Sequence, residues 1–265
     1  VWSTDPMMAG AMDEVRVWDH ERTPEQIHEN LLKQLTGSEP GLAALWNFDD
    51  PANPGRDASP NHRDGKLMGN ARAGEDTPGG IQAPSLFPFT GNVLQMDGDG
   101  GMETGVAIIR TADDYTVECW AFTGSIDPNQ FRIIAAQNRQ FYLGTTLTGK
   151  LRLGDGWGDT GVSFPSGGWH HFAFCKRGDN ASLYIDGNLA GERAGTLPSP
   201  LESGTFRIGR QWGSEPGMGG ERGAIPDQGM AAPCQRVVDR PRHREDLAAR
   251  FGGDPGADQR ARALG

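Results

Sequence analysis

Short runs of apolar residues, many of them β-branched or aromatic, alternate with Gly, Asp, Asn and Pro along most of the chain. Runs of this length without interleaved helical patterns favour many short antiparallel strands. The predicted strands are residues 42–48, 93–96, 115–123, 132–137, 141–146, 150–153, 169–176, 181–185 and 205–209. Asp186 and Gly187 predict a tight hairpin turn, because this dipeptide accepts the positive φ angles that such a turn needs. Residues 50–92 and 210–230 contain few apolar residues and are interpreted as long loops.

An amphipathic helix is predicted before the first of these strands. Thr23 is suited to cap it, Pro24 to occupy its first position, and Gln26 to complete a capping box. Gly37 is predicted to end the helix. Its apolar side is formed by residues that recur every four positions, namely Ile27, Leu31 and Leu35.

The segment 15–27 has a weaker copy at residues 235–247, displaced by 220 positions. The identical pairs are Arg16 and Arg236, Val17 and Val237, Asp19 and Asp239, Arg22 and Arg242, and Glu25 and Glu245. A period of this length is typical of tandem globular domains and too long for a solenoid. We therefore predict that residues 1–38 are the tail of one domain and that 42–252 form most of the next. Residues 253–265 are predicted to be a disordered tail.

Composition and charge exclude several classes of function. No stretch approaches the ~20 apolar residues of a membrane span, and a net charge of −10 argues against a nucleic-acid partner. The three cysteines are too few for a disulfide framework or a zinc site, although one bridge remains an alternative to free thiols. The chain begins with Val1 and no leader pattern follows, so we expect a piece of a longer protein.

Eight motifs in a fixed order resemble the LamG-like jelly-roll group of the concanavalin A-like lectin/glucanase superfamily. The first is Met12-Asp13-Glu14-Val15-Arg16-Val17-Trp18, in the preceding tail. The others are Leu45-Trp46-Asn47-Phe48-Asp49, Asp57-Ala58-Ser59-Pro60-Asn61-His62-Arg63-Asp64-Gly65, Leu94-Gln95-Met96-Asp97-Gly98, Tyr115-Thr116-Val117-Glu118-Cys119-Trp120, Gly168-Trp169-His170-His171-Phe172-Ala173, Leu183-Tyr184-Ile185-Asp186-Gly187 and Phe206-Arg207-Ile208-Gly209.

The resemblance implies an all-β, two-sheet antiparallel jelly-roll sandwich with a short helix after the final strand of each repeat. Such modules are usually extracellular, stand beside further LamG-like domains in the same chain, and bind a glycan or protein ligand, often with calcium. A structural spacer or adhesin repeat without a ligand is the alternative. Cys119 and Cys175 fall in strands that resemble neighbours in this family, so both a bridge and two buried thiols stay open.

One part of the chain departs from the family pattern. The first copy of the closing strand carries Asp13 and Glu14, whereas the second has Pro233 and Cys234 at those places. Proline removes a donor of the strand ladder. The whole segment 221–235 is atypical, and divergence, an insertion or a reading-frame error would each account for it.

Catalysis is not predicted. A glycosidase needs two carboxylates on one face, and no predicted strand carries two acids at such spacing, because Glu118 stands alone in its strand. His170 and His171 are adjacent in a strand, so their side chains face opposite sides and do not chelate one metal together. We interpret one as packed and the other as exposed.

The acid-rich loop between residues 49 and 64 is the candidate metal site. Asp57, Asn61 and Asp64 supply three oxygen-bearing side chains within eight residues, which suits calcium. The same residues are also typical of turns in which the side chain binds its own backbone. Both interpretations remain, and the resemblance adds weight to a structural calcium.

Glycan recognition calls for an exposed aromatic ring beside fixed polar groups. Trp157 lies in a glycine-rich loop between Asp155 and Asp159, and Trp212 lies in a second loop. These four residues are the predicted ligand-binding set. Trp46, Trp120 and Trp169 fall within strand motifs and are predicted to be core.

Overall fold

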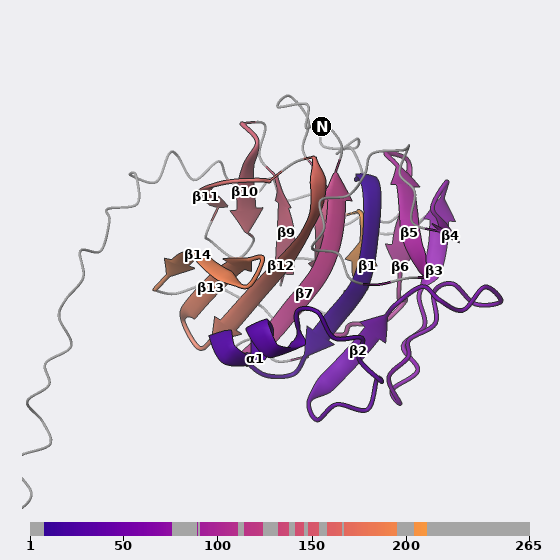
Figure 1. Cartoon of the computed structure of the whole chain (residues 1–265), viewed down its shortest axis with the longest axis horizontal. Helices are drawn as coiled ribbons and strands as arrows, with labels where there is room; N and C mark the ends of the chain where they lie inside the picture. Colours follow the sequence, from indigo (N-terminus) through magenta and orange to yellow (C-terminus); the bar gives the residue numbers. More distant parts are fainter. Residues whose placement is uncertain are drawn as a thin grey trace, which may run out of the picture. The chain divides into compact units, whose positions relative to one another are not determined.

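A computed structural model describes residues 8–75, 89, 91–110, 114–123, 132–137, 141–145, 148–153, 158–165, 167–194 and 204–210 (Figure 1). The chain divides into two compact units, Val1–Gly219 and Gly220–Gly265. The second unit lies entirely outside the described residues, together with Pro233, Cys234 and the second copy of the repeat. The boundary between the units follows Gly219, and residues 8–38 belong to the same unit as the predicted domain.

The first unit contains two antiparallel sheets, which confirms the predicted jelly-roll class. The strands of sheet A are, in order, β14 (Asn188–Arg193), β13 (Asn180–Ile185), β12 (Gly168–Arg177), β7 (Asp114–Thr123), β1 (Ala9–Trp18), β5 (Asn92–Asp97) and β4 (Arg72–Glu75), with β2 (Leu42–Trp46) also paired to β1. The strands of sheet B are β11 (Gly158–Ser163), β10 (Lys150–Leu153), β9 (Phe141–Thr145), β8 (Ile133–Gln137), β15 (Phe206–Ile208), β6 (Gly100–Glu103) and β3 (Lys66–Gly69).

Every strand predicted from the apolar runs is present, but five further strands were missed: β3, β4, β6, β11 and β14. The interpretation of residues 50–92 as one long loop was therefore wrong, since β3 and β4 lie there. Four of the missed strands form the outer edges of the two sheets. An edge strand is half exposed and needs few apolar residues, so its sequence lacks the signal that identifies a central strand.

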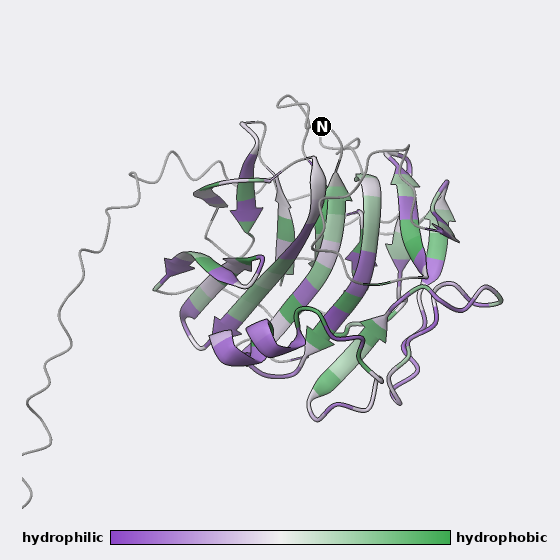
Figure 2. Ribbon diagram, in the orientation of Figure 1, coloured by the Kyte–Doolittle hydropathy of each residue, from purple (hydrophilic) through white to green (hydrophobic). Residues whose placement is uncertain are grey.

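The main core lies between the sheets and is built on stacked aromatic rings. Phe206 of β15 stacks on Trp46 of β2, with ring centroids 5.6 Å apart, and on Phe141 of β9 at 6.3 Å. Figure 2 shows β2 as largely hydrophobic, whereas the helix and the loops beside β2 are hydrophilic. Burial of such rings provides most of the driving force that holds the two sheets face to face.

Strand β1 occupies the middle of sheet A, although it comes first in the sequence (Figure 1). One side pairs with β7, where Arg16 lies opposite Glu118. Its other side pairs with β5 near the beginning of β1 and with β2 near the end. The tail thus contributes a central strand to this sandwich. Whether it also closes a preceding domain stays a prediction.

The helix α1 spans Pro24–Asn30 and has the predicted N-terminus, with Thr23 as the cap and Gln26 in a capping box. Its predicted end at Gly37 was wrong, because the helix stops after Asn30. The guanidinium of Arg16 donates to the carbonyl oxygens of Asn30 at 3.0 Å and Lys33 at 2.7 Å. Side-chain donors of this kind satisfy the carbonyls that a helix leaves unpaired, so the chain can turn early. Among the described residues, no helix has the length and apolarity needed to cross a membrane.

Residues 24–35 cover the outer face of sheet A. Ile27 packs with Ala173, Cys175 and Tyr184, and Leu31 packs with Trp120 and Trp169. The tryptophans predicted to be core are all buried, but Trp120 and Trp169 lie on this covered outer face. Trp120 Nε1 donates to the Leu31 carbonyl at 3.2 Å. The cover explains how a sheet can be apolar on both faces.

Cys119 and Cys175 lie on the paired strands β7 and β12, yet they are free thiols. Cys119 is opposite Phe172 and Cys175 is opposite Thr116, so the two cysteines are offset by three residues. An odd offset places side chains on opposite faces of a sheet. Cys119 accordingly packs in the main core and Cys175 beneath α1, which excludes the bridge that the resemblance left open.

The hairpin between β13 and β14 has the predicted turn. Asp186 and Gly187 have φ angles of 51° and 76°, as a two-residue turn of this type requires. The Asp186 carboxylate also accepts from the backbone of His171 at 2.9 Å and contacts the ring of His170 at 2.8 Å. The turn is therefore tied to the neighbouring strand β12.

Candidate functional site

The loop between β2 and β3 is organised around the carboxylate of Asp57, which is only 1% exposed. Its Oδ1 accepts from the backbone of Leu45 at 3.0 Å and of Ser59 at 2.9 Å. Its Oδ2 accepts from the Ser59 hydroxyl at 2.9 Å and from the backbone of Arg63 at 2.8 Å. The Asp57 carboxylate therefore ties the loop to β2 and fixes the position of the Arg63 backbone.

The other two predicted metal ligands belong to the same web of hydrogen bonds. The Asn61 side-chain amide donates to the Ala43 carbonyl at 3.0 Å. Asp64 Oδ1 accepts from the backbone of Asp57 at 3.0 Å, and its Oδ2 accepts from the Asn53 side chain at 2.9 Å. The structure thus places all three predicted residues in one loop, where each binds protein groups.

The arrangement at Asp57 does not fit a calcium ion. A carboxylate has about four lone-pair positions, and the four hydrogen bonds to Asp57 use them all. Calcium prefers six to eight oxygens that are free to face it. Among the described residues there is also no group of three or more His, Cys, Asp or Glu side chains able to hold a metal. The contacts of Asp57 are those of the turn-forming alternative, and calcium binding by the protein stays a prediction.

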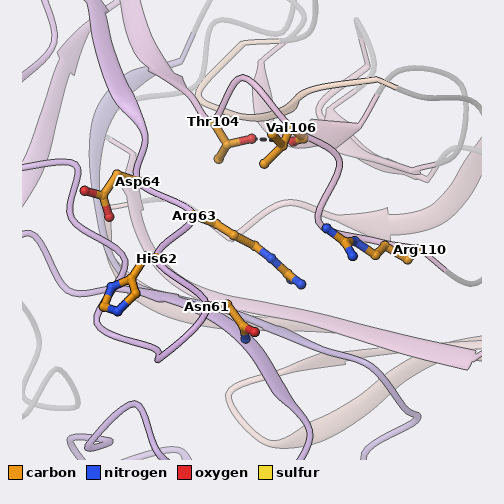
Figure 3. Close-up of a pocket in the computed structure, with 7 residues that line it drawn as sticks. All are labelled: Asn61, His62, Arg63, Asp64, Thr104, Val106 and Arg110. Carbon is orange, nitrogen blue, oxygen red and sulfur yellow. Dashed lines mark hydrogen bonds between the residues drawn. The ribbon is translucent and has the colours of Figure 1, made fainter.

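A pocket of about 520 Å³ opens beside this loop (Figure 3). One wall comes from residues 61–64, and the other from the segment that follows β6. The lining residues are Asn61, His62, Arg63, Asp64, Thr104, Val106 and Arg110. Most of them are polar, and the exposed Val106 is the one aliphatic member. A pocket of this size and lining suits a small polar ligand.

The wall opposite the loop is fixed by Gln137, which is fully buried on β8. Gln137 Oε1 accepts from the backbones of Ile108 at 2.8 Å and Ile109 at 2.9 Å, and its Nε2 donates to the Ile109 carbonyl at 2.7 Å. Arg110 follows directly. Sequence reasoning missed Arg63, Thr104 and Arg110 as pocket residues, because they come from segments 40 residues or more apart that only the fold brings together.

The comparisons with known proteins bear on the fold at this point. Residues 96–221 match the family described as the concanavalin A-like lectin/glucanases superfamily. The match confirms the family that the motifs resemble, and the other strands of the two sheets extend the same sandwich on the N-terminal side.

Two of the solved structures that the comparison returned resemble part of the chain. One is domain 4 of AbnA, a GH43 extracellular arabinanase from Geobacillus stearothermophilus, in complex with arabinotriose. It is 19% identical, with a TM-score of 0.45 over 66% of this chain and 85% of that one. The other is a mutant of HCR/D, which is 12% identical, with a TM-score of 0.30 over 58% of this chain and 39% of that one. No curated protein matches the sequence.

The superfamily name covers both lectins and glucanases. A glucanase would need a pair of carboxylates that reach the sugar, so the acids that cluster in the sandwich were compared with that requirement. Glu118 was noted from the sequence as a lone acid in its strand. In the fold it gains neighbours from β1, namely Glu14 and Arg16. Arg16 Nη2 lies 2.8 Å from Glu14 Oε2, and its Nη1 lies 3.9 Å from Glu118 Oε1. All three side chains are buried beneath residues 24–35.

The electrostatics of this cluster are those of a structural network. Burial alone would raise the pKa of Glu118, but His171 and the positive charge of Arg16 lower it to about 2. The ring nitrogen of His171 lies 3.3 Å from Glu118 Oε2 without hydrogen-bond alignment, and Trp18 Nε1 donates to Oε1 at 2.6 Å. An ionised and enclosed acid neither donates a proton to a glycosidic oxygen nor reaches a sugar. Burial raises the pKa of the neighbouring Glu14, but its carboxylate is enclosed as well and is paired with Arg16.

The predicted ligand-binding set is only partly visible. Asp159 lies in β11, and its Oδ1 accepts from the Gly161 backbone at 2.8 Å, a local turn contact. Asp155, Trp157 and Trp212 lie outside the described residues. Of the two adjacent histidines, His171 is buried as predicted, whereas the side chain of His170 is only 22% exposed because it packs against Asp186.

Proposed function

We propose that this protein is a non-catalytic, extracellular recognition module that binds carbohydrate or protein through surface loops. The observation that carries the proposal is that residues 96–221 match a lectin/glucanase superfamily, joined here to a polar pocket between two loops. A ligand site combines apolar surface with a few polar groups at fixed positions, which provide its specificity. The described pocket supplies both.

Two surfaces are proposed for contact with a ligand. One is the pocket beside Arg63. The other would be formed by Asp155, Trp157 and Trp212 together with Asp159 of β11, with an indole ring that stacks on a sugar face. The second surface is proposed on sequence alone.

The absence of catalysis is part of the proposal. Its support is that Glu14 and Glu118, acids drawn together on sheet A, are buried and bound to Arg16. A glycoside hydrolase of the same fold is the less favoured alternative. Release of reducing sugars from a panel of polysaccharides by the purified chain would contradict the non-catalytic assignment.

The test of binding is a glycan array probed with the labelled chain, followed by calorimetry on each positive saccharide. We expect at least one saccharide class to bind with a dissociation constant that is reproduced in solution. Trp157→Ala should weaken binding if the glycine-rich loop is used, and Arg56→Gln is the control, since Arg56 already pairs with Asp50 at 3.5 Å.

The rival is a structural spacer or adhesin segment without a ligand of its own. It predicts no saccharide binding on the array and no change of melting temperature with any saccharide. A binding-competent chain would instead be stabilised by its ligand in proportion to the logarithm of ligand concentration over Kd.

A further inference from the structure

Arg63 projects its guanidinium into the pocket from a rigid base. Its backbone nitrogen is fixed by Asp57 at 2.8 Å, and its Nη1 donates to the Ala43 carbonyl at 3.0 Å. The side chain is half-buried. The remaining N–H groups of this guanidinium have no hydrogen-bond acceptor among the described residues, so they are free to bind a ligand.

Arg110 enters the same pocket from the opposite wall. Figure 3 shows the two guanidinium groups pointing toward each other across the open space. The backbone before Arg110 is held by Gln137 through Ile108 and Ile109. Two cationic groups from separate segments are therefore presented by preformed backbone, which lowers the entropy cost of binding a ligand between them.

Among the described residues, no acidic side chain lies between the two arginines. Within the described part of the chain, no carboxylate lies within ion-pair distance of either guanidinium, although Arg16, Arg56, Arg177 and Arg207 all have such partners. Burial and the charge of Arg110 lower the pKa of Arg63, against the attraction of Asp57. The positive charges of Arg63 and Arg110 repel each other, although the whole protein has a net charge of −10. An anion bound between them relieves this repulsion.

The rest of the lining leaves space for more than a bare ion. Asp64 does not compete for the arginines, because its two oxygens bind Asp57 and Asn53, and Figure 3 shows its carboxylate directed away from Arg63. The Oδ1 of the exposed Asn61 has no donor among the described residues and can accept from a hydroxyl. The side chain of Val106, a residue that is 46% exposed, offers an aliphatic surface to the C–H face of a sugar ring.

We propose that Arg63 and Arg110 form an oxyanion site for an acidic saccharide, whose carboxylate or sulfate lies between the two guanidinium groups. The planar N–H edge of arginine matches either oxyanion in a two-point hydrogen bond. This inference rests on the proposed recognition function and specifies its ligand class. The sugar ring then extends toward Asn61 and Val106.

The test uses matched probes on the whole chain. Methyl glucuronide and methyl glucoside differ only in whether carbon 6 is a carboxylate or an alcohol, and the 6-sulfate of methyl glucoside supplies the second oxyanion. Dissociation constants are measured by calorimetry or ligand-observed NMR. Because a hydrogen bond to a charged group is stronger than one between neutral groups, we expect one or both acidic sugars to bind at least about tenfold more tightly than the glucoside.

The variants are Arg63→Gln, Arg110→Gln and the control Arg56→Gln. The first two should each reduce binding of the preferred acidic sugar by about tenfold or more, and the control should leave it unchanged. Arg110 is exposed and has no hydrogen bond or ion pair among the described residues, so the Arg110→Gln protein stays informative even if Arg63→Gln unfolds. Calorimetric titration with inorganic sulfate reports whether the anion alone suffices.

Three results would overturn the inference: equal binding of acidic and neutral sugars, full binding by Arg110→Gln, or free sulfate binding as tightly as the sugars. The proposed function fails separately. Neutral saccharides that bind equally well to all variants would keep the recognition function while rejecting this oxyanion site. An array with no bound saccharide of any charge would reject both.

Discussion

Two regions of this sandwich use arginine in opposite ways. Beneath α1, Arg16 is fully buried. Its guanidinium forms ion pairs with Glu14 and Glu118 and donates a hydrogen bond to the carbonyl at the end of the helix. Beside the β2–β3 loop, Arg63 and Arg110 face a pocket without any acid partner among the described residues. In the first region the charge is neutralised within the protein. In the second region, the described part of the chain supplies no carboxylate to balance the two positive charges.

The difference separates residues that make the fold from residues available to a ligand. A buried charge must be paired, since an unpaired one would make the folded state unstable. A half-exposed arginine tolerates the lack of a partner because water solvates it, and a ligand with the right charge can replace that water. Whether an arginine has an acidic partner within the chain is therefore a better guide to its function here than the fact that it is an arginine.

The largest expected effect is at Arg16. Arg16→Met leaves Glu14 and Glu118 buried without their cation and frees the carbonyls of the helix end. Breaking a buried pair costs about 3–5 kcal/mol, and we expect a loss of that size in urea unfolding. Arg56→Met is the control, because the Arg56 side chain is 58% exposed, and it should change stability by less than about 0.5 kcal/mol. Equal effects would remove the distinction between the two regions.

Asp57→Ala should come next. It removes four hydrogen bonds and leaves the buried backbone donor of Leu45 unsatisfied, at about 1–3 kcal/mol for each such group. We expect the free energy of unfolding, measured with urea or heat, to fall by at least about 3 kcal/mol. The loss should be the same in calcium and in chelator, because the four hydrogen bonds to Asp57 leave no lone pair for a metal. A wild-type melting temperature that rises with millimolar calcium, with the rise lost in Asp57→Ala, would instead support the calcium site predicted from the sequence.

The pH dependence of stability should reveal Glu118. Its pKa is about 2 in the folded state against an ordinary 4.5, so its contribution is present above pH 4.5 and is lost as the pH falls toward 2. The difference corresponds to on the order of 3 kcal/mol. The gap in unfolding free energy between the wild type and Glu118→Gln should therefore shrink between pH 5 and pH 2. A gap independent of pH would mean that Glu118 is not held as an ion.

Asp13 should show the opposite sign. Burial, followed by the charge of Glu14, raises its pKa well above the ordinary value. A raised pKa means that the ionised acid destabilises the fold at neutral pH and that this cost disappears as the pH falls. Asp13→Asn should therefore be neutral or stabilising at pH 7, with the gain decreasing toward pH 4. A loss of stability at pH 7 that persists at pH 4 would show that Asp13 is needed for packing alone.

The sequence was sufficient for the sandwich and for the capped start of α1. Central strands such as β7 and β12 are rich in apolar residues, and Thr23, Pro24 and Gln26 act locally. It was insufficient for edge strands, which are half exposed, and for the end of α1, which depends on Arg16 from another element. The predicted loop around Asp57 was found, but the pocket required Arg110, which only the pairing of distant strands brings near.

We infer that Arg63 and Arg110 serve a ligand and not the fold. The most direct measurement is the comparison of wild type and Arg110→Gln by calorimetric titration with the preferred acidic methyl glycoside, alongside urea unfolding of both proteins. The account predicts stability within about 0.5 kcal/mol of the wild type together with a loss of binding of about tenfold or more. Unchanged binding, or a large loss of stability, would contradict it.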